Sequence, residues 1–397
     1  MTPLRVAVVR KASGAESGGA TFEDDLWFAA MRATTMHRLI MYPDSAHTQQ
    51  FAREQHAGDR ITFVPALKEP SLPARGVQRA SRTIRREPAP RPFAALGDAL
   101  VAAGAHCAWM LGASITPLDI PYVATVWDLQ HRVQPWFPEV SSNGQWTERE
   151  RLFPEYIRRA AAVIVGTEVG ADEIRVAYGE PAGGLHVLPL PTPSFVLDAA
   201  LGPIPARLVE LPARYLFYPA QFWSHKNHVT ALRTLALLAA DPEMPHLVLV
   251  GADRGTLDHV MRTATALGVQ DRLHALGHVD RATLVALYAH AEALLFPSMF
   301  GPDNLPPLEA MALGCPVIAA RVNGAEEQLG DAAILVDALD AEGFAAAIRA
   351  LRLDHAHREA MIARGRKRAN AWTASQYVSA VFELIERRIE PVRALWP

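Results

Sequence analysis

The chain has 397 residues, of which 50% are hydrophobic and 20% charged, and its formal net charge is -3. This balance indicates a globular protein, and the net charge gives no support for a general nucleic-acid binder, which needs a strongly basic surface. The length exceeds what one hydrophobic core usually serves, so we expect two domains. The two cysteines, Cys107 and Cys315, lie in apolar runs in different halves, and they therefore indicate neither a disulfide framework nor a thiolate metal site.

The N-terminal residues lead directly into an apolar strand and have neither a long apolar core nor a small-residue cleavage site. No apolar run approaches the roughly 18 to 20 residues of a membrane span. From these features we expect a protein of the reducing cytoplasm, with any contact to the inner membrane face being peripheral.

Short apolar runs alternate with helical or irregular segments through the first half of the chain. Such alternation is typical of an α/β protein with a parallel, doubly wound sheet. A loop containing Gly18 and Gly19 follows the first run, and a helix is expected from about Phe22. The loop lacks both the GxGxxG dinucleotide fingerprint and the Lys-Ser/Thr of a P-loop, which excludes these two types of site. Strands are expected at residues 4–9, 38–42, 61–65, 106–110, 123–127, 162–166 and 185–188.

Residues 70–92 are rich in proline and arginine, and the arginines from Arg75 to Arg91 stand against a single acidic residue, Glu87. Two explanations stay open for this segment: an ordinary solvated surface loop, or a contact with an anionic membrane surface.

Aromatic and polar side chains crowd together at residues 127–146, directly after an expected strand. Ligands of open α/β sheets bind at the carboxyl ends of strands. Sugar rings stack on aromatic faces and their hydroxyls take directional hydrogen bonds, so Trp127, Asp128 and His131 are candidates for sugar recognition. The alternative is a capping loop whose aromatic residues pack between domains.

A proline-rich stretch at residues 188–205 is the expected interdomain linker, because it can sustain neither a helix nor a central strand. Beyond it, Lys226 stands near the start of a helix, where its charge would lie beside backbone N–H donors. His225 and His228 have no obvious third ligand, so a metal site is not expected there. Further strands are expected at residues 215–219, 246–250, 272–276, 294–297, 316–319 and 333–336, followed by a last helix at 374–388.

Residues 291–320 predict the order strand, loop, helix, strand. Pro306 and Pro307 open the helix, and Glu309 is expected in its first turn. Free backbone N–H groups and the positive helix end would then face the loop, where an anion or a ribose can bind. The alternative is an ordinary sheet-covering helix in which Glu309 merely complements the dipole.

The run from Phe300 to Glu309 resembles the signature of nucleotide-sugar-dependent, retaining glycosyltransferases of the GT-B type, that is, the bacterial glycosyltransferase group 1 (family 4-like) proteins. That signature carries two glutamates. The second matches Glu309, whereas the first falls on Gly301, so that Asp303 is the nearest carboxylate. The resemblance covers the second half of the chain and, more loosely, residues 120–195.

This resemblance implies two Rossmann-like domains facing across a cleft: an acceptor-binding domain at residues 1–205, a nucleotide-sugar-binding domain at 206–375, and a helix at 376–397 that returns to the first domain. It implies transfer of a sugar from a UDP- or GDP-sugar to a hydroxyl of a saccharide or lipid-linked saccharide, without a cofactor. No metal is expected because the chain offers no convincing DxD-type cluster, and the net charge gives no support for nucleic acid as a partner. The catalytic candidates are Lys226, Glu309, Asp128 and His131. The donor-binding candidates are Gln221, Lys226, Gly251, His278, Val279, Asp303, Asn304, Leu305 and Glu309, and the acceptor-binding candidates are Gly18, Gly19, Trp127, Asp128 and His131.

Three other functions stay open. A GT-B nucleotide-sugar epimerase would need an acid/base pair around the sugar. A nicotinamide dehydrogenase would need the fingerprint that is missing after residues 4–9. A non-catalytic sugar-binding protein would be expected to lose the pair of Lys226 and Glu309, which this chain keeps.

Overall fold

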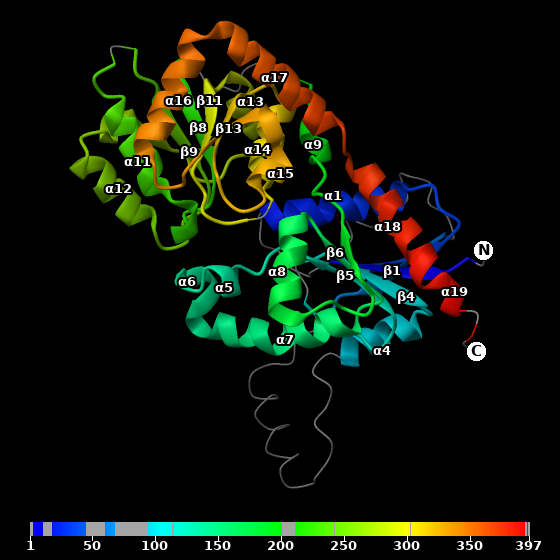
Figure 1. Ribbon diagram of the computed structural model, residues 1–397. Coiled ribbons are helices and arrows are strands. Elements are labelled where there is room, and N and C mark those ends of the chain that lie inside the picture. Colours follow the sequence, from blue (N-terminus) through cyan, green and yellow to red (C-terminus); the bar gives the residue numbers. More distant parts are fainter. Residues whose placement is uncertain are drawn as a thin grey trace.

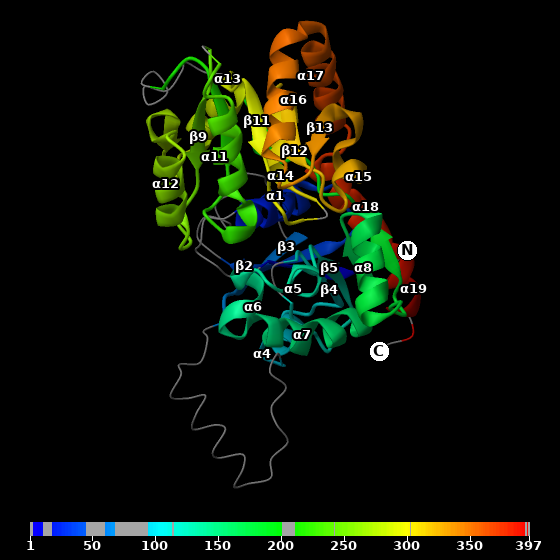
Figure 2. The same ribbon diagram turned by 60° about the vertical axis from the view of Figure 1, so that its left-hand side comes forward.

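The computed structural model describes residues 3–10, 18–44, 60–67, 94–112, 115–200, 211–241, 243–301, 303–393 and 395. These residues form two parallel sheets, each with its own helices, and Figure 1 shows them as two bodies joined at one side. The expected α/β class with two doubly wound domains is therefore confirmed. The view in Figure 2 shows that α1 (Gly18–Arg32) lies at the junction, beneath the helices of the second domain.

The first sheet has the strand order β3-β2-β1-β4-β5-β6-β7, with parallel pairing throughout the described strands. Its central strands are near-continuous apolar runs because helices cover both faces of the sheet. The strands are β1 (Arg5–Val9), β2 (Arg38–Asp44), β3 (Ile61–Pro65), β4 (Cys107–Met110), β5 (Tyr122–Val126), β6 (Ala162–Val165) and β7 (Leu185–Val187). The helices of this domain after α1 are α4 (Ala94–Ala102), α5 (Gln130–Val133), α6 (Pro138–Ser141), α7 (Gln145–Arg159), α8 (Glu168–Tyr178) and α9 (Ser194–Leu197).

The second sheet has the order β10-β9-β8-β11-β12-β13 and is also parallel. Its strands are β8 (Tyr215–Pro219), β9 (His246–Val250), β10 (Leu273–Ala275), β11 (Ala293–Phe296), β12 (Val317–Ala320) and β13 (Ala333–Val336). Its helices are α11 (His228–Leu237), α12 (Leu257–Ala266), α13 (Arg281–His290), α14 (Leu305–Ala312), α15 (Ala325–Leu329), α16 (Ala341–Leu353) and α17 (His355–Asn370). Short 3-10 turns also occur, of which η3 (Ser224–Lys226) bears on the site.

The helix α18 (Ala374–Arg388) packs on the first domain rather than the second. Thr373 precedes this helix and forms a capping box with Gln376. The side chain of each of these two residues accepts a hydrogen bond from the backbone N–H of the other. Tyr377 and Phe382 of α18 are buried in the same core cluster as Trp27 of α1. The expected return of the last helix to the first domain is thus confirmed, and α19 (Glu390–Arg393) follows it.

Two expected helix starts are wrong. The helix α1 begins at Gly18 rather than near Phe22, and α14 begins at Leu305, which moves Glu309 out of the first turn. The expected strands agree with the observed strands to within one or two residues at each end.

Two further expectations fall on undescribed residues. The domain boundary at residues 205 and 206 lies within 201–210, so its position stays a prediction. The arginine-rich segment from Arg75 to Arg91 lies outside the described residues, and its membrane contact is likewise a prediction. In the described part of the chain, no helix is long and apolar enough to cross a membrane.

Candidate functional site

The segments that follow β5 and β6 meet the segments that follow β11 and β12. Gln134 Nε2 donates to the carbonyl of Met299 over 2.9 Å, and the backbone N–H of Glu168 donates to Glu327 Oε1 over 2.9 Å. These bonds join the two domains at the carboxyl ends of their strands. This is the edge at which open α/β sheets bind ligands.

Lys226 lies at this edge, at the end of the 3-10 turn η3. The residue as a whole is partly exposed, and its ammonium lies 3.4 Å from Ser298 Oγ and 5.6 Å from the centre of the Phe296 ring. Burial lowers the pKa of Lys226 to about 8, while the carboxylates of Asp128 and Glu139 in the first domain oppose this shift. Lys226 is therefore a cation set between the domains, with acidic groups facing it from the first domain.

Glu309 lies in the second turn of α14, and its partner is a tyrosine of the neighbouring helix α13. Tyr288 donates its hydroxyl hydrogen to Glu309 Oε2 over 2.6 Å. Burial raises the pKa of Glu309 to about 7, although the bond from Tyr288 opposes the shift. Because Oε2 is held by Tyr288, the other carboxylate oxygen is the one available to accept hydrogen bonds from a ligand.

The start of α14 offers fewer N–H donors than the sequence predicts. Pro306 and Pro307 have none, and the N–H of Asn304 is bound to Gln328 Oε1 over 2.9 Å. Gln328 Nε2 in turn donates to the carbonyl of Asn304 over 2.8 Å. Leu305 packs against the core of the first domain. The helix dipole and the Lys226 charge, rather than a row of N–H groups, supply the positive field here.

Asp303 reaches across to the first domain. A Cβ atom built on Gly166 would overlap Asp303 Oδ2, so the carboxyl group lies directly against the glycine that follows β6. Burial raises the pKa of Asp303 to about 8, and the negative charges of Asp128 and Glu327 add to the shift. Asp303 is thus a largely protonated contact between the domains, which differs from the donor-binding role expected for it and leaves that role a prediction.

The remaining donor-binding candidates lie on the loops after β8, β9 and β10. Gln221 Oε1 accepts from Trp223 Nε1 over 2.9 Å, and the N–H of Gly251 donates to the carbonyl of Gly277 over 2.9 Å. A side chain at Gly251 would overlap the backbone of Ala220, so these loops approach closely. His278 and the buried Val279 directly follow Gly277.

The first domain brings together some of the expected acceptor-binding residues. Gly18 and Gly19 begin α1, and one turn later Phe22 packs edge-on against Trp127, with ring centroids 6.1 Å apart. Asp128 Oδ1 accepts from the N–H of Gln130 over 2.9 Å and lies 3.3 Å from an Arg149 nitrogen. Its charge acts on both Lys226 and Asp303, which places it toward the domain interface.

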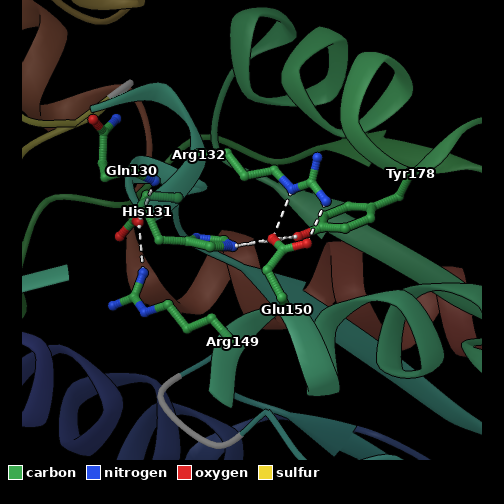
Figure 3. A network of polar contacts seen from close by, with 7 residues as sticks. Gln130, His131, Arg132, Arg149, Glu150 and Tyr178 are labelled. Carbon is green, nitrogen blue, oxygen red and sulfur yellow. Dashed lines mark hydrogen bonds and ion pairs between the residues drawn. The ribbon is translucent and has the colours of Figure 1, made fainter. Parts of the chain in front are cut away.

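His131 is buried beside this group and has different partners. Its side chain is fully buried, its ring stacks on Phe153 with centroids 5.3 Å apart, and Nε2 lies 2.9 Å from Glu150 Oε1. Figure 3 shows Glu150 at the centre of a network of polar contacts, in which Arg132 and Tyr178 also donate hydrogen bonds to its carboxylate. Burial lowers the pKa of His131. These contacts favour a structural role for His131 over the predicted catalytic one.

The sequence assigned no individual role to three residues near the site. The first is Tyr288, an aromatic residue on a helix, whose hydrogen bond to Glu309 no sequence pattern indicated. Glu139, from the polar run after β5, binds His225 of the second domain. Glu173 of α8 has two buried carboxylate oxygens without a hydrogen-bond partner, and burial followed by the charge of Asp128 raises its pKa to about 7.

Among the described residues no group of three His, Cys, Asp or Glu side chains could hold a metal ion, and metal independence stays a prediction.

Comparison with known proteins agrees with this geometry. Residues 207–368 match the family described as glycosyl transferases group 1. Over 160 residues the chain is 30% identical to the O-antigen chain mannosyltransferase B of Escherichia coli, an alignment that covers 40% of this chain and 42% of that protein. The chain thus spans about two fifths of the length of this relative.

Two solved structures match nearly the whole chain. The sucrose-phosphate synthase from Thermosynechococcus elongatus has a TM-score of 0.70 at 18% identity, covering 97% of this chain and 98% of that one. The Anabaena protein Alr3699/HepE in complex with UDP and glucose has a TM-score of 0.66 at 16% identity, covering 97% and 100%. At these identities the likeness shows the fold alone, and the expected GT-B fold is confirmed.

Proposed function

We propose that the chain, whose residues 207–368 match the family described as glycosyl transferases group 1, transfers a sugar from a UDP- or GDP-sugar to a hydroxyl group of a saccharide. The transfer retains the configuration of the anomeric carbon. The acceptor belongs to a cell-surface polysaccharide or a glycolipid. The relative named O-antigen chain mannosyltransferase B supports this acceptor class, and the solved neighbour with UDP and glucose supports a nucleotide-sugar donor.

One observation carries the proposal. Lys226 and Glu309 lie in the segments that directly follow β8 and β11, which are neighbouring strands of the second sheet, at the edge that faces the first domain. A nucleotide sugar has two features that such a pair fits. Its diphosphate needs a fixed cation, and its ribose offers hydroxyl donors to a carboxylate. A cation held in a partly water-excluded site stabilises developing negative charge better than a solvated one does.

In this reaction the bond between the anomeric carbon and the diphosphate oxygen breaks, and a bond from the acceptor oxygen to the same carbon forms on the same face. The electron pair of the broken bond remains on the diphosphate, whose charge Lys226 and the α14 dipole stabilise. The proton of the acceptor hydroxyl passes to an oxygen of the leaving phosphate. The protein then needs no nucleophile of its own, and Glu309 orients the ribose.

The test is a thermal-shift panel with UDP, GDP, ADP and their sugars, followed by turnover of Lys226→Ala, Glu309→Ala and the double variant. A ligand that binds only the folded state raises its stability with concentration. Loss of each charge-assisted contact should cost about 1.5 to 3 kcal/mol, roughly ten- to over a hundredfold in kcat/KM. Lys367→Ala, which removes an exposed lysine of α17, is the matched control and should have normal turnover. If the folded double variant turned over at the wild-type rate, the assignment of the donor site to Lys226 and Glu309 would be wrong.

A further inference from the structure

Glu139 of the first domain is bound to the loop that carries Lys226. It lies in the short helix α6, and only 7% of its side chain is exposed. Its Oε1 atom accepts two hydrogen bonds from His225 of the second domain: one from the backbone N–H over 2.8 Å, and one from ring Nδ1. Lys226 is the next residue along the chain, so the two bonds hold the backbone directly before it.

The same part of the first domain also holds the loop after β11. The His225 ring stacks on Phe300 with centroids 3.9 Å apart and planes at 9°, and Phe137 packs edge-on against Phe300 at 5.1 Å. The N–H of Met299 donates to the carbonyl of His225 over 2.8 Å. Gln134 Nε2 binds the Met299 carbonyl, as described above. Residues 134–139 of the first domain therefore fix both loops of the second domain that surround Lys226.

The charges around this contact favour a functional role. Burial alone would raise the pKa of Glu139, but the hydrogen bonds from His225 outweigh it, so the net pKa is lowered and the group is ionised. Its second oxygen, Oε2, is buried and has no hydrogen-bond partner. An unpaired buried charge is costly, and the nearby ammonium of Lys226 offsets part of that cost.

We propose that Glu139 is a positioning residue, which places Lys226 for the donor diphosphate when the two domains are closed. The inference rests on the proposed function. It adds that a residue of the first domain completes the donor site on the second domain. A purely structural contact would hold the domains together without changing how Lys226 titrates, whereas a positioning carboxylate beside the lysine changes that titration.

The experiment measures the affinity for UDP or GDP, whichever stabilises the wild type, from pH 6 to pH 10. The charged and titratable groups that face Lys226 are Asp128, Glu139, His225 and His228. Burial lowers the pKa of both histidines, to about 4 for His225 and about 3 for His228, so neither changes charge in this range. In the wild type, affinity should fall as pH rises through about 8, because Lys226 loses its proton there.

Three variants separate position from charge. Glu139→Gln removes the charge, so affinity at pH 7 should fall about tenfold and the alkaline limb should move to lower pH by about one unit. Glu139→Asp keeps the charge on a shorter side chain; it should retain the wild-type limb but lose affinity. Glu148→Gln, on an exposed glutamate of α7 that is paired with Arg151, should match the wild type in both respects.

Different results of this experiment would overturn the role of Glu139 and the proposed function. A Glu139→Gln variant with wild-type affinity and a wild-type limb would overturn the role of Glu139 and leave the donor site intact. Binding of neither UDP nor GDP by the wild type would overturn the proposed function, and the inference with it. Because Glu139→Asp keeps a negative charge beside His225 and Lys226, it keeps the test decisive even where Glu139→Gln fails to fold.

Discussion

Replacing Glu309 by glutamine separates the energetic cost of burying this carboxylate from its use in binding. The folded protein raises the pKa of Glu309 from its usual 4.5 to about 7. Between these two pH values the unfolded chain has released the proton while the folded chain still holds it. The free energy of unfolding therefore falls as pH rises through this window. A shift of about 2.5 units at about 1.4 kcal/mol per unit gives a loss of roughly 3 kcal/mol, complete above pH 7.

Glutamine has nearly the same shape, can accept the bond from Tyr288, and does not ionise. We therefore expect Glu309→Gln to be more stable than the wild type at pH 8, by up to about 3 kcal/mol, and to differ little from it at pH 5. In the second domain that corresponds to a rise of several degrees in melting temperature at pH 8. The same variant should lose about tenfold or more of its affinity for the nucleoside diphosphate, because an amide oxygen is a weaker acceptor for ribose hydroxyls.

The assay is thermal denaturation of both proteins at pH 5 and pH 8, with and without UDP or GDP. Glu359→Gln, on an exposed glutamate of α17, is the control and should change neither value. An equal effect of Glu309→Gln at both pH values, or a loss of stability at pH 8, would show that the carboxylate is not held neutral by burial. The reasoning about its pKa would then be wrong.

Two further predictions concern the backbone and the metal requirement. Gly251→Ala should destabilise the second domain by about 2 to 4 kcal/mol in thermal denaturation, because its methyl group would overlap the Ala220 backbone and its φ is 157°. Gly97→Ala in α4, where the nearest atom is 3.9 Å from the new methyl, should instead stabilise by about 0.5 to 1 kcal/mol, and equal effects of the two would refute the packing argument. Sugar transfer should continue in a chelator, since Lys226 and the α14 dipole supply the positive field; activity that a chelator abolishes and Mn²⁺ or Mg²⁺ restores would contradict this.

Local patterns in the sequence determined the elements of the fold and the places of Lys226 and Glu309 after their strands. Apolar runs bounded by Gly and Pro predict buried strands, and the observed strands differ from them by one or two residues at most. Lys226 after one strand and Glu309 after another follow from the same order of strand, loop and helix. These predictions succeed because the backbone geometry of a strand or a helix depends mainly on its own residues.

The start of α14 shows where such local reasoning ends. The two prolines predict a helix opened by Pro306, yet the helix begins one residue earlier, at Leu305, and Glu309 moves to the second turn. The carboxylate is bonded to Tyr288 of α13 rather than lying at the helix end. Helix boundaries depend on caps and neighbours, which the sequence pattern specifies only to within a residue or two.

Only the tertiary structure decided which polar groups meet across the domains. Glu139 and His225 are 86 residues apart, and Asp303 lies against Gly166 from the other domain. Their pairing depends on how two separately folded sheets are placed, and no periodicity along the chain encodes that placement. Burial distinguishes the remaining candidates. His131 is fully buried and lies against Glu150, whereas Lys226 and Glu309 lie in segments that follow the carboxyl ends of β8 and β11.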